Sequence, residues 1–183
     1  MTIEENIEHF CSYFERQIEL IGSLTNKSDG YQAPEDYQIP FYQKVLLVSA
    51  LDTLTAIRFP REQYPALSRK NRERFVRFIK DYTNWDSGNL VSTPFLHDHL
   101  LKNKLENDNL AKHLANKLAQ QNPKDGLVLT IDKIDEQPEA LLVLAGSEKE
   151  EEAIFFYQHY DLLYRYRNFL VHESRMPGYG MEG

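Results

Sequence analysis

Apolar residues recur every three or four positions along several stretches of the chain, which is the spacing of one face of an α-helix. The first stretch has its apolar positions at Ile7, Phe10, Phe14, Ile18 and Ile21. Thr2 and Glu5 have the spacing of a capping box before it, and Gly22 follows its last apolar position. We therefore expect a helix over about residues 3–22, with its apolar face in the core.

A second stretch, over about residues 41–57, is apolar on nearly all sides of a helix. This pattern is typical of a helix in the centre of a bundle. Asp52 interrupts the pattern, and an unpaired charge in such a place is costly. We therefore expect Asp52 either to face outward in a polar seam with Ser49 and Thr53 or to be held by a cation.

Helical spacing continues through most of the remaining chain. Residues 68–82 are basic and aromatic, residues 94–121 carry a leucine stripe in one helix or two, and residues 147–172 begin with Ser147 and a run of glutamates. The helix dipole favours acids in a first turn and bases near the end. We therefore expect a long final helix that Ser147 caps.

The apolar runs within residues 124–146 have a different pattern. Leu127–Ile131 is typical of a short strand, and Ala140–Leu144 fits either its partner strand or the start of a helix. The whole chain has 183 residues, the usual size of one domain. We therefore predict a single, mostly all-α helical bundle over residues 1–183, with a short β excursion around residues 124–146.

The composition is that of an ordinary globular protein, with 42% hydrophobic and 27% charged residues. The N-terminus is acidic where a secretory signal is basic, and no apolar run approaches the roughly 20 residues of a membrane span. Cys11, the single cysteine, lies on the predicted buried face of the first helix, which indicates a core thiol and no internal disulfide. We therefore expect a cytoplasmic protein that has no membrane partner.

The net charge of −7 argues against a protein that coats nucleic acid through many phosphate contacts. One segment differs from this average, because eight basic residues and only two acids lie between Arg58 and Lys80. Two interpretations stay open for this basic segment. It is either a solvated helix face or a phosphate-binding surface.

The end of the last predicted helix reads Arg167-Asn168-Phe169-Leu170-Val171-His172. An arginine and a histidine at this spacing are a weak signal alone. Asn168 directly after the arginine, and the position at the end of an aromatic helix, strengthen the signal. In this context the run resembles the signature of the HEPN superfamily, which is an arginine, a polar residue and a histidine in the last helix of a helical bundle.

The resemblance has several implications. It implies a metal-independent endoribonuclease of the kind found in toxin, antiviral-defence and RNA-processing systems, and a homodimer that brings two motifs into one cleft. Its catalytic residues would be Arg167 and His172, together with Asn168. The implied partners are RNA and an antitoxin or other regulatory protein, and we expect neither a metal nor another cofactor.

The chemistry of these residue types fits such a reaction. A histidine side chain titrates in the range needed to take the proton of a ribose 2′-OH, which then attacks the neighbouring phosphorus, and His172 is the candidate. The guanidinium of Arg167 is always charged and can bind the phosphate oxygens as their negative charge grows. The amide of Asn168 can orient the histidine or the phosphate. The expected products are a 2′,3′-cyclic phosphate and a 5′-hydroxyl.

Helix geometry leaves the identity of the arginine open. Arg167 and His172 point about 140° apart on an ideal helix, whereas Arg165, Asn168 and His172 share one stripe with Asp161. Arg167 is the first choice and Arg165 the second. We expect Arg167 to reach the site if the helix unwinds near its end or if a second subunit supplies the other half.

A structural role is the alternative for these residues, because Arg165 or Arg167 can simply pair with Asp161 or Asp52. The corresponding alternative function is a non-catalytic HEPN-type module that dimerises or binds a nucleotide or a protein partner. The acidic net charge of the chain supports this alternative.

Overall fold

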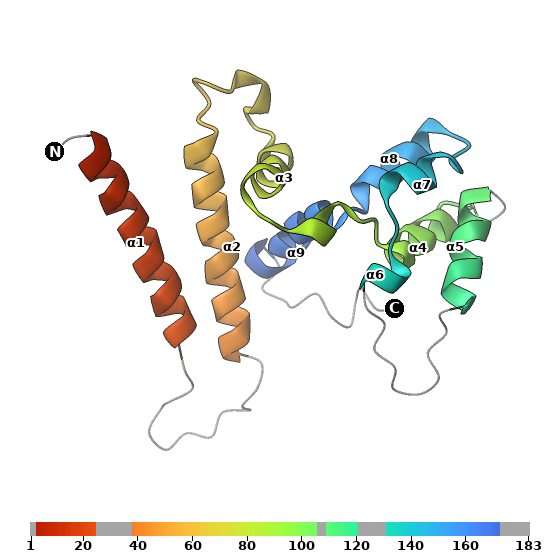
Figure 1. The fold of residues 1–183 in the computed structure, drawn as a ribbon, viewed down its shortest axis with the longest axis horizontal. Coiled ribbons are helices and arrows are strands. Elements are labelled where there is room, and N and C mark those ends of the chain that lie inside the picture. Colours follow the sequence, from red (N-terminus) through yellow and green to blue (C-terminus); the bar gives the residue numbers. More distant parts are fainter. Residues whose placement is uncertain (1–2, 25–37, 106–108, 121–130, 173–183) are drawn as a thin grey trace, which may run out of the picture. The chain divides into compact units, whose positions relative to one another are not determined.

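The computed structural model describes residues 3–24, 38–105, 109–120 and 131–172. Most of these residues lie in helices (Figure 1). The helices are α1 (Ile3–Ser23), α2 (Gln38–Arg58), α3 (Asn71–Tyr82), α4 (Thr93–Lys102), α5 (Asn109–Gln120), α6 (Ile131–Ile134), α7 (Pro138–Leu142), α8 (Glu148–Phe156) and α9 (His159–His172). The described residues contain no strand, so the predicted all-α class is confirmed. None of their helices is both long and apolar enough to cross a membrane.

The chain divides into two compact units. The first comprises residues 1–75 and 165–183, and the second comprises residues 76–164. The boundaries fall within α3 and α9, so each of these helices supplies residues to both units. The prediction that the chain is one domain stays a prediction.

In the first unit, α1 and α2 lie side by side and run in opposite directions (Figure 1). Gln43 on α2 donates a hydrogen bond to the backbone oxygen of Ile21 at 3.1 Å. Ile21 is the one buried residue among the described side chains of α1, and Ile7 and Ile18 are about half exposed. The predictions of a fully buried apolar face and of a buried Cys11 are therefore wrong, because α2 covers only one side of α1 and Cys11 is exposed.

The second helix also differs from its prediction. It was expected at the centre of a bundle, yet Val48 and Thr55 are its buried side chains among the described residues. Phe59, directly after α2, is 1% exposed and packs edge-on against Tyr64, with ring centroids 5.1 Å apart. One side of α2 therefore faces the core, and another side leaves large apolar groups in contact with solvent.

The core of the second unit is built by α4, α5, α7 and α8. Its fully buried members are Val91, Leu96, Leu100, Leu110, Leu114, Leu141 and Ile154. The leucine stripe predicted over residues 94–121 forms two helices, since α4 ends at Lys102. Lys104 follows in the left-handed conformation, with φ of 60°, which a continuing helix does not allow.

The final helix predicted over residues 147–172 is also two helices. Its cap is confirmed, because the Ser147 hydroxyl accepts a hydrogen bond from the backbone N–H of Glu150 at 3.4 Å. The break falls at Tyr157, whose carbonyl accepts a hydrogen bond from the N–H of Ser92 at 2.9 Å. Backbone groups near Tyr157 therefore bond the chain before α4 instead of continuing one helix, which is why the single-helix prediction is wrong.

The predicted β excursion around residues 124–146 is not a strand pair in the described residues. Ile131 begins α6, and Ala140–Leu142 belongs to α7, so the helix alternative for that run is correct. Residues 127–130 lie outside the described part of the chain. Within the described part of this segment, Glu136 forms an isolated bridge with Val91, and its carbonyl accepts a hydrogen bond from Val91 N–H at 2.8 Å.

Two neighbouring carboxylates, Asp135 and Glu136, join separate segments of the second unit. Glu136, whose side chain is 14% exposed, contacts His113 Nε2 at 2.8 Å and Lys117 Nζ at 3.0 Å. Asp135, which is 5% exposed, contacts His159 Nε2 at 2.6 Å. Burial raises the pKa of the Glu136 carboxyl, but hydrogen bonds and charges from Lys117 and His113 lower that pKa by more, so its net shift is downward.

We expect Glu136→Gln to lower the free energy of unfolding by about 1–3 kcal/mol near neutral pH. Because the carboxyl pKa is lower in the folded chain than in the unfolded chain, its stabilisation is present above the unfolded pKa and disappears as the pH falls through the folded pKa. Urea unfolding of both proteins across this range measures the effect. The matched control is Glu139→Gln, at an exposed position of α7. A difference that stays constant down to acid pH would contradict the prediction.

A substitution at Gly88 can test the packing of the second unit. A Cβ atom at Gly88 would lie 2.2 Å from Cε1 of Tyr160. This ring is 8% exposed and its hydroxyl donates to the Trp85 carbonyl at 3.1 Å, so it has little room to move. We expect Gly88→Ala to destabilise the protein by about 1–3 kcal/mol in thermal unfolding. Gly22→Ala, where no atom lies within 4 Å of the new Cβ, should be neutral or slightly stabilising.

Candidate active site

The predicted motif lies in the last turns of α9, within the first unit. Arg167 and Asn168 are half-buried, and His172 is exposed at the end of the helix. Leu170, which is 1% exposed, fixes this part of α9 in the core. The buried Leu170 thus holds one side of α9 inward while His172 meets solvent.

Arg167 is bound to Asp52 of α2, 115 residues away in the sequence. Its Nε donates a hydrogen bond to Asp52 Oδ2 at 2.6 Å, and its Nη2 donates to the same oxygen. The Arg167 side chain is 13% exposed and that of Asp52 is 27% exposed. The cation expected for Asp52 is therefore Arg167, and the pair is shielded enough from water to fix the direction of the guanidinium.

The opposite edge of the guanidinium faces the other two motif residues. Nη1 of Arg167 lies 2.9 Å from Asn168 Oδ1 and 2.8 Å from His172 Nε2. A guanidinium only donates hydrogen bonds, so Nε2 of His172 must accept one. The contact therefore requires the neutral imidazole that carries its proton on Nδ1, which leaves Nε2 as the basic atom.

This contact corrects the geometric expectation from the sequence. Arg167 and His172 meet within one chain, and α9 is a continuous helix through both of them. The difference of about 140° in direction is bridged because the arginine side chain is long and His172 is the last helical residue. Neither an unwound turn nor a second subunit is needed to bring the two side chains together.

The other two candidates lie elsewhere on α9. Among the described residues, Asp52 and His172 both make their hydrogen bonds with Arg167 and not with Arg165. Arg165 is half-buried, and Asp161 is 5% exposed in the first turn of the helix. The contacts thus favour Arg167 as the central arginine. Its catalytic role, and any role of Arg165 or Asp161, stay predictions.

The cluster places a carboxylate and an imidazole on two edges of a single guanidinium cation. Asp52 occupies the Nε and Nη2 edge of Arg167, and the Nη1 edge faces the exposed side chain of His172. A phosphate that approaches His172 from solvent would therefore meet Nη1. Binding its oxygen there would replace the hydrogen bond from Arg167 to Nε2 and leave that atom able to accept a proton.

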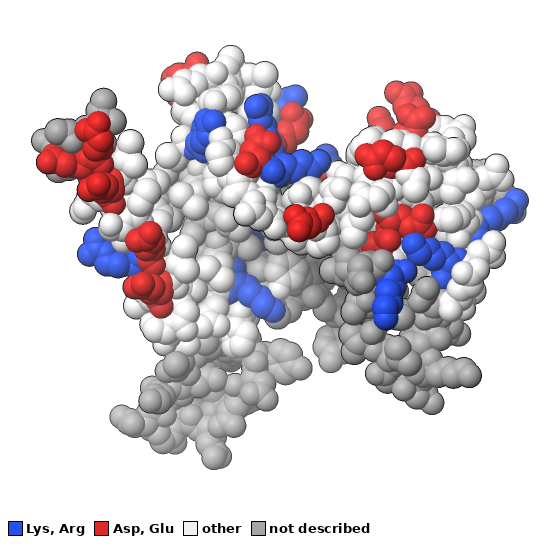
Figure 2. Space-filling view, in the orientation of Figure 1, with Lys and Arg blue, Asp and Glu red and all other residues white. Residues whose placement is uncertain are grey.

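The described residues contain no group of three or more His, Cys, Asp or Glu side chains that could hold a metal ion. The basic segment from Arg58 to Lys80 carries ion pairs along its helix. Lys70 contacts Glu73 at 3.1 Å and Arg77 contacts Asp81 at 3.3 Å, with all four side chains about half exposed. Basic and acidic side chains accordingly alternate on the visible surface of α3 (Figure 2). These contacts are typical of a solvated helix face, and a phosphate-binding role for the segment stays a prediction.

Comparison of the chain with models of known protein families, with curated protein sequences and with solved structures gives no match. The likeness to the HEPN superfamily therefore depends on the motif in α9 and on the all-α fold. Any function must be argued from the residues of the site itself.

The coupling between Asp52 and Arg167 can be measured with a double-mutant cycle. We expect Asp52→Asn, Arg167→Gln and the double variant to give a coupling energy of about 1–3 kcal/mol in urea unfolding, because the pair is largely shielded from water. The control is Asp98 with Lys102, whose side chains are 2.7 Å apart but 49% and 67% exposed. That pair should couple by less than about 0.5 kcal/mol. Equal coupling in both pairs would contradict the interpretation.

Proposed function

We propose that the protein is a metal-independent endoribonuclease of the HEPN kind, with its active site at Arg167 and His172. The observation that carries the proposal is the guanidinium of Arg167, held by Asp52 on one edge and 2.8 Å from Nε2 of His172 on the other. A fixed cation beside a neutral base at the surface is the combination that cleavage through a 2′-OH needs.

In the proposed reaction a phosphate of RNA binds Nη1 of Arg167 and frees Nε2 of His172. Nε2 then takes the proton of the 2′-OH, and the 2′ oxygen forms a bond to phosphorus. The bond from phosphorus to the 5′ oxygen breaks, and this oxygen leaves with a proton from water as a 5′-hydroxyl. The product on the other side is a 2′,3′-cyclic phosphate.

Asp52 acts in this scheme as a positioning residue. A carboxylate on the Nε and Nη2 edge restricts rotation of the guanidinium, so its Nη1 edge stays directed at the reacting phosphate. The carboxylate also neutralises part of the charge of Arg167. Asp52→Asn should therefore retain part of the RNA-cleaving activity, whereas Arg167→Ala should lose much more of it.

The proposal includes two partners besides RNA. One is a second copy of the chain, so that two motifs act in one dimer. The other is an antitoxin or other regulatory protein, because an RNA-cleaving enzyme in a toxin or defence system must be kept silent. The orientation of Arg167 within one chain means that the second copy is proposed for substrate binding and not for completing the Arg–His contact.

The test is cleavage of RNA in the presence of EDTA. Wild type should produce 2′,3′-cyclic phosphate ends, and Arg167→Ala and His172→Ala should each lose activity by about 10²–10⁴-fold. Asp52→Asn should fall between these variants and the wild type. Mass spectrometry of the RNA ends distinguishes this chemistry from metal-dependent hydrolysis.

Arg165→Ala tests which of the two arginines is catalytic. A loss of cleavage equal to that of Arg167→Ala would raise Arg165 from second choice to an equal candidate. His97→Ala, on α4 in the second unit, is the histidine control and should leave cleavage unchanged. If the wild type leaves RNA intact, or if cleavage persists in both Arg167→Ala and His172→Ala, the proposal fails. A wild type that is harmless on expression and inert toward RNA would favour the partner-binding module.

A further inference from the structure

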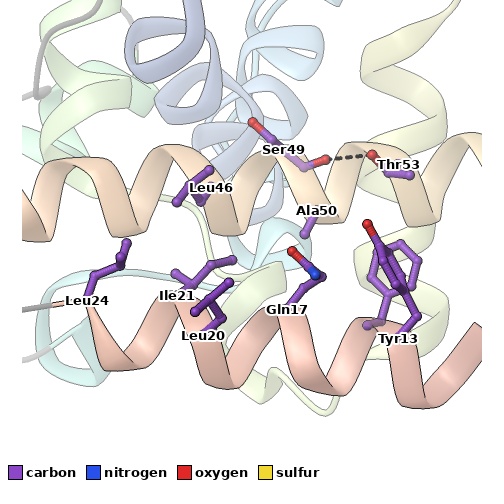
Figure 3. Close-up of a pocket in the computed structure, with 10 residues that line it drawn as sticks. Tyr13, Gln17, Leu20, Ile21, Leu24, Leu46, Ser49, Ala50 and Thr53 are labelled. Carbon is purple, nitrogen blue, oxygen red and sulfur yellow. Dashed lines mark hydrogen bonds between the residues drawn. The ribbon is translucent and has the colours of Figure 1, made fainter.

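The first unit contains a cavity that does not suit an anionic ligand. It lies between α1 and α2, has a volume of about 370 Å³ and is lined by side chains such as Leu20, Leu46 and Ser49 (Figure 3). None of its lining residues is charged. A phosphate would find no cation there, so a further contact to RNA in the first unit would have to lie on another surface.

The loop between α2 and α3, residues 59–70, offers such a surface. It carries three basic residues and one acid, Glu62. Arg61 and Arg69 are exposed, and neither side chain makes a hydrogen bond or an ion pair with the described residues. At the α3 end of the basic segment, by contrast, cations contact acids three or four positions away. The contacts therefore divide the segment into a compensated helix and a loop whose two arginines keep their charge available.

Backbone and ring contacts fix the shape of this loop. The N–H groups of Gln63 and Tyr64 both donate to the carbonyl of Pro60, at 3.2 and 2.9 Å. Phe59 is 1% exposed and its ring packs edge-on against that of Tyr64. The guanidinium of Arg58 lies 5.3 Å from the centre of the Phe59 ring and donates to the Tyr64 hydroxyl at 2.9 Å. The loop is thus anchored at its start in the core of the first unit.

Arg69 has an uncommon backbone conformation for an arginine. Its φ is 62°, in the left-handed region that glycine adopts at lower cost. No hydrogen bond or ion pair of its side chain with the described residues offsets this cost. Residues held in such conformations are concentrated at functional sites. An exposed arginine at a position that favours glycine therefore indicates a use for its charge.

We propose that the α2–α3 loop binds the phosphate backbone of the RNA substrate through Arg61 and Arg69. The inference rests on the proposed function for its ligand. The loop follows α2 directly, and α2 carries Asp52, which holds Arg167. Arg58, the last residue of α2, is six positions after Asp52, which is about 9 Å along a helix. A strand of several nucleotides bound at the candidate site can therefore extend to the loop.

The charge of the chain agrees with a contact surface of this small size. A net charge of −7 argues against many phosphate contacts, whereas two contacts need only the two arginines of the loop. A guanidinium can bind two oxygens of one phosphate through parallel N–H groups. Contacts to phosphates carry no sequence information. The loop would therefore add affinity for RNA without selecting the sequence that is cleaved.

The test is the affinity for a short single-stranded RNA, measured by fluorescence anisotropy at several salt concentrations. Every protein carries His172→Ala, which removes the proposed base and keeps the RNA intact. We expect Arg61→Gln and Arg69→Gly each to weaken binding about 3–10-fold. Each should also reduce the slope of log Kd against log salt by about 0.7, the value for one phosphate contact of a single strand.

Lys104→Gly is the matched control for Arg69→Gly. Lys104 is also exposed and left-handed, with φ of 60°, but it lies in the second unit. Both substitutions remove one positive charge, and both should leave Tm nearly unchanged, because relief of the left-handed conformation offsets the freedom of glycine in the unfolded chain. Only Arg69→Gly should weaken RNA binding. Arg77→Gln, whose arginine contacts Asp81, is the corresponding control for Arg61→Gln.

Binding that neither Arg61→Gln nor Arg69→Gly weakens overturns the inference, and so does a protein without measurable affinity for RNA. An equal loss in Lys104→Gly also overturns it, because total charge and not the loop would then control binding. Vesicles of anionic lipid are the other source of phosphate groups. If the loop variants weaken binding to such vesicles and not to RNA, the assignment of RNA to the loop is wrong.

Cleavage assays without His172→Ala separate this inference from the proposed function. The two loop variants should raise KM for a long RNA and leave kcat unchanged, and cleavage of a dinucleotide should not change. Loop-dependent binding by a protein that never cleaves RNA supports the loop and refutes the ribonuclease. Cleavage through His172 with an unchanged KM in both variants refutes the loop and supports the ribonuclease.

Discussion

The ion pair between Asp52 and Arg167 is the interaction on which the candidate site depends. It joins α2 to the end of α9 across 115 residues of sequence, and it fixes a guanidinium that would otherwise rotate freely. Because Asp52 takes the Nε and Nη2 edge, the Nη1 edge is left to face Asn168 and His172. The position of Asp52 in the apolar helix α2 therefore determines the direction of the Arg167 guanidinium in α9.

Periodicity predicted the class of the fold and most of its helices, because helix formation follows local spacing. It did not predict where helices break. Tyr157 and Lys104 lie at breaks that arise from backbone hydrogen bonds to distant segments and from a left-handed residue. Burial on α1 and α2 was predicted least well. An apolar face shows that a residue favours burial, but it does not say whether this chain or another covers it, as Ile7, Cys11 and Ile18 illustrate.

The residues of the candidate site could be named from the sequence, and Asp52 could be offered as a partner of Arg165 or Arg167, but the choice between these pairs could not be made. Arg167, Asn168 and His172 form a local motif, and Asp52 is conspicuous as a charge among apolar neighbours. That Asp52 pairs with Arg167 depends on how α2 and α9 pack, which no local pattern contains. An ideal helix separates Arg167 from His172, and the freedom of a long side chain at a helix end brings them together.

The contact between Arg167 and Nε2 of His172 also joins the last residue of α9 to a side chain five positions earlier. The last carbonyl groups of a helix have no partner within the helix, so a side-chain contact in this turn limits its fraying. Asp52 of α2 holds the same guanidinium, so the end of α9 is joined to α2 through one arginine. The position of the histidine is therefore set in part by a carboxylate on another helix.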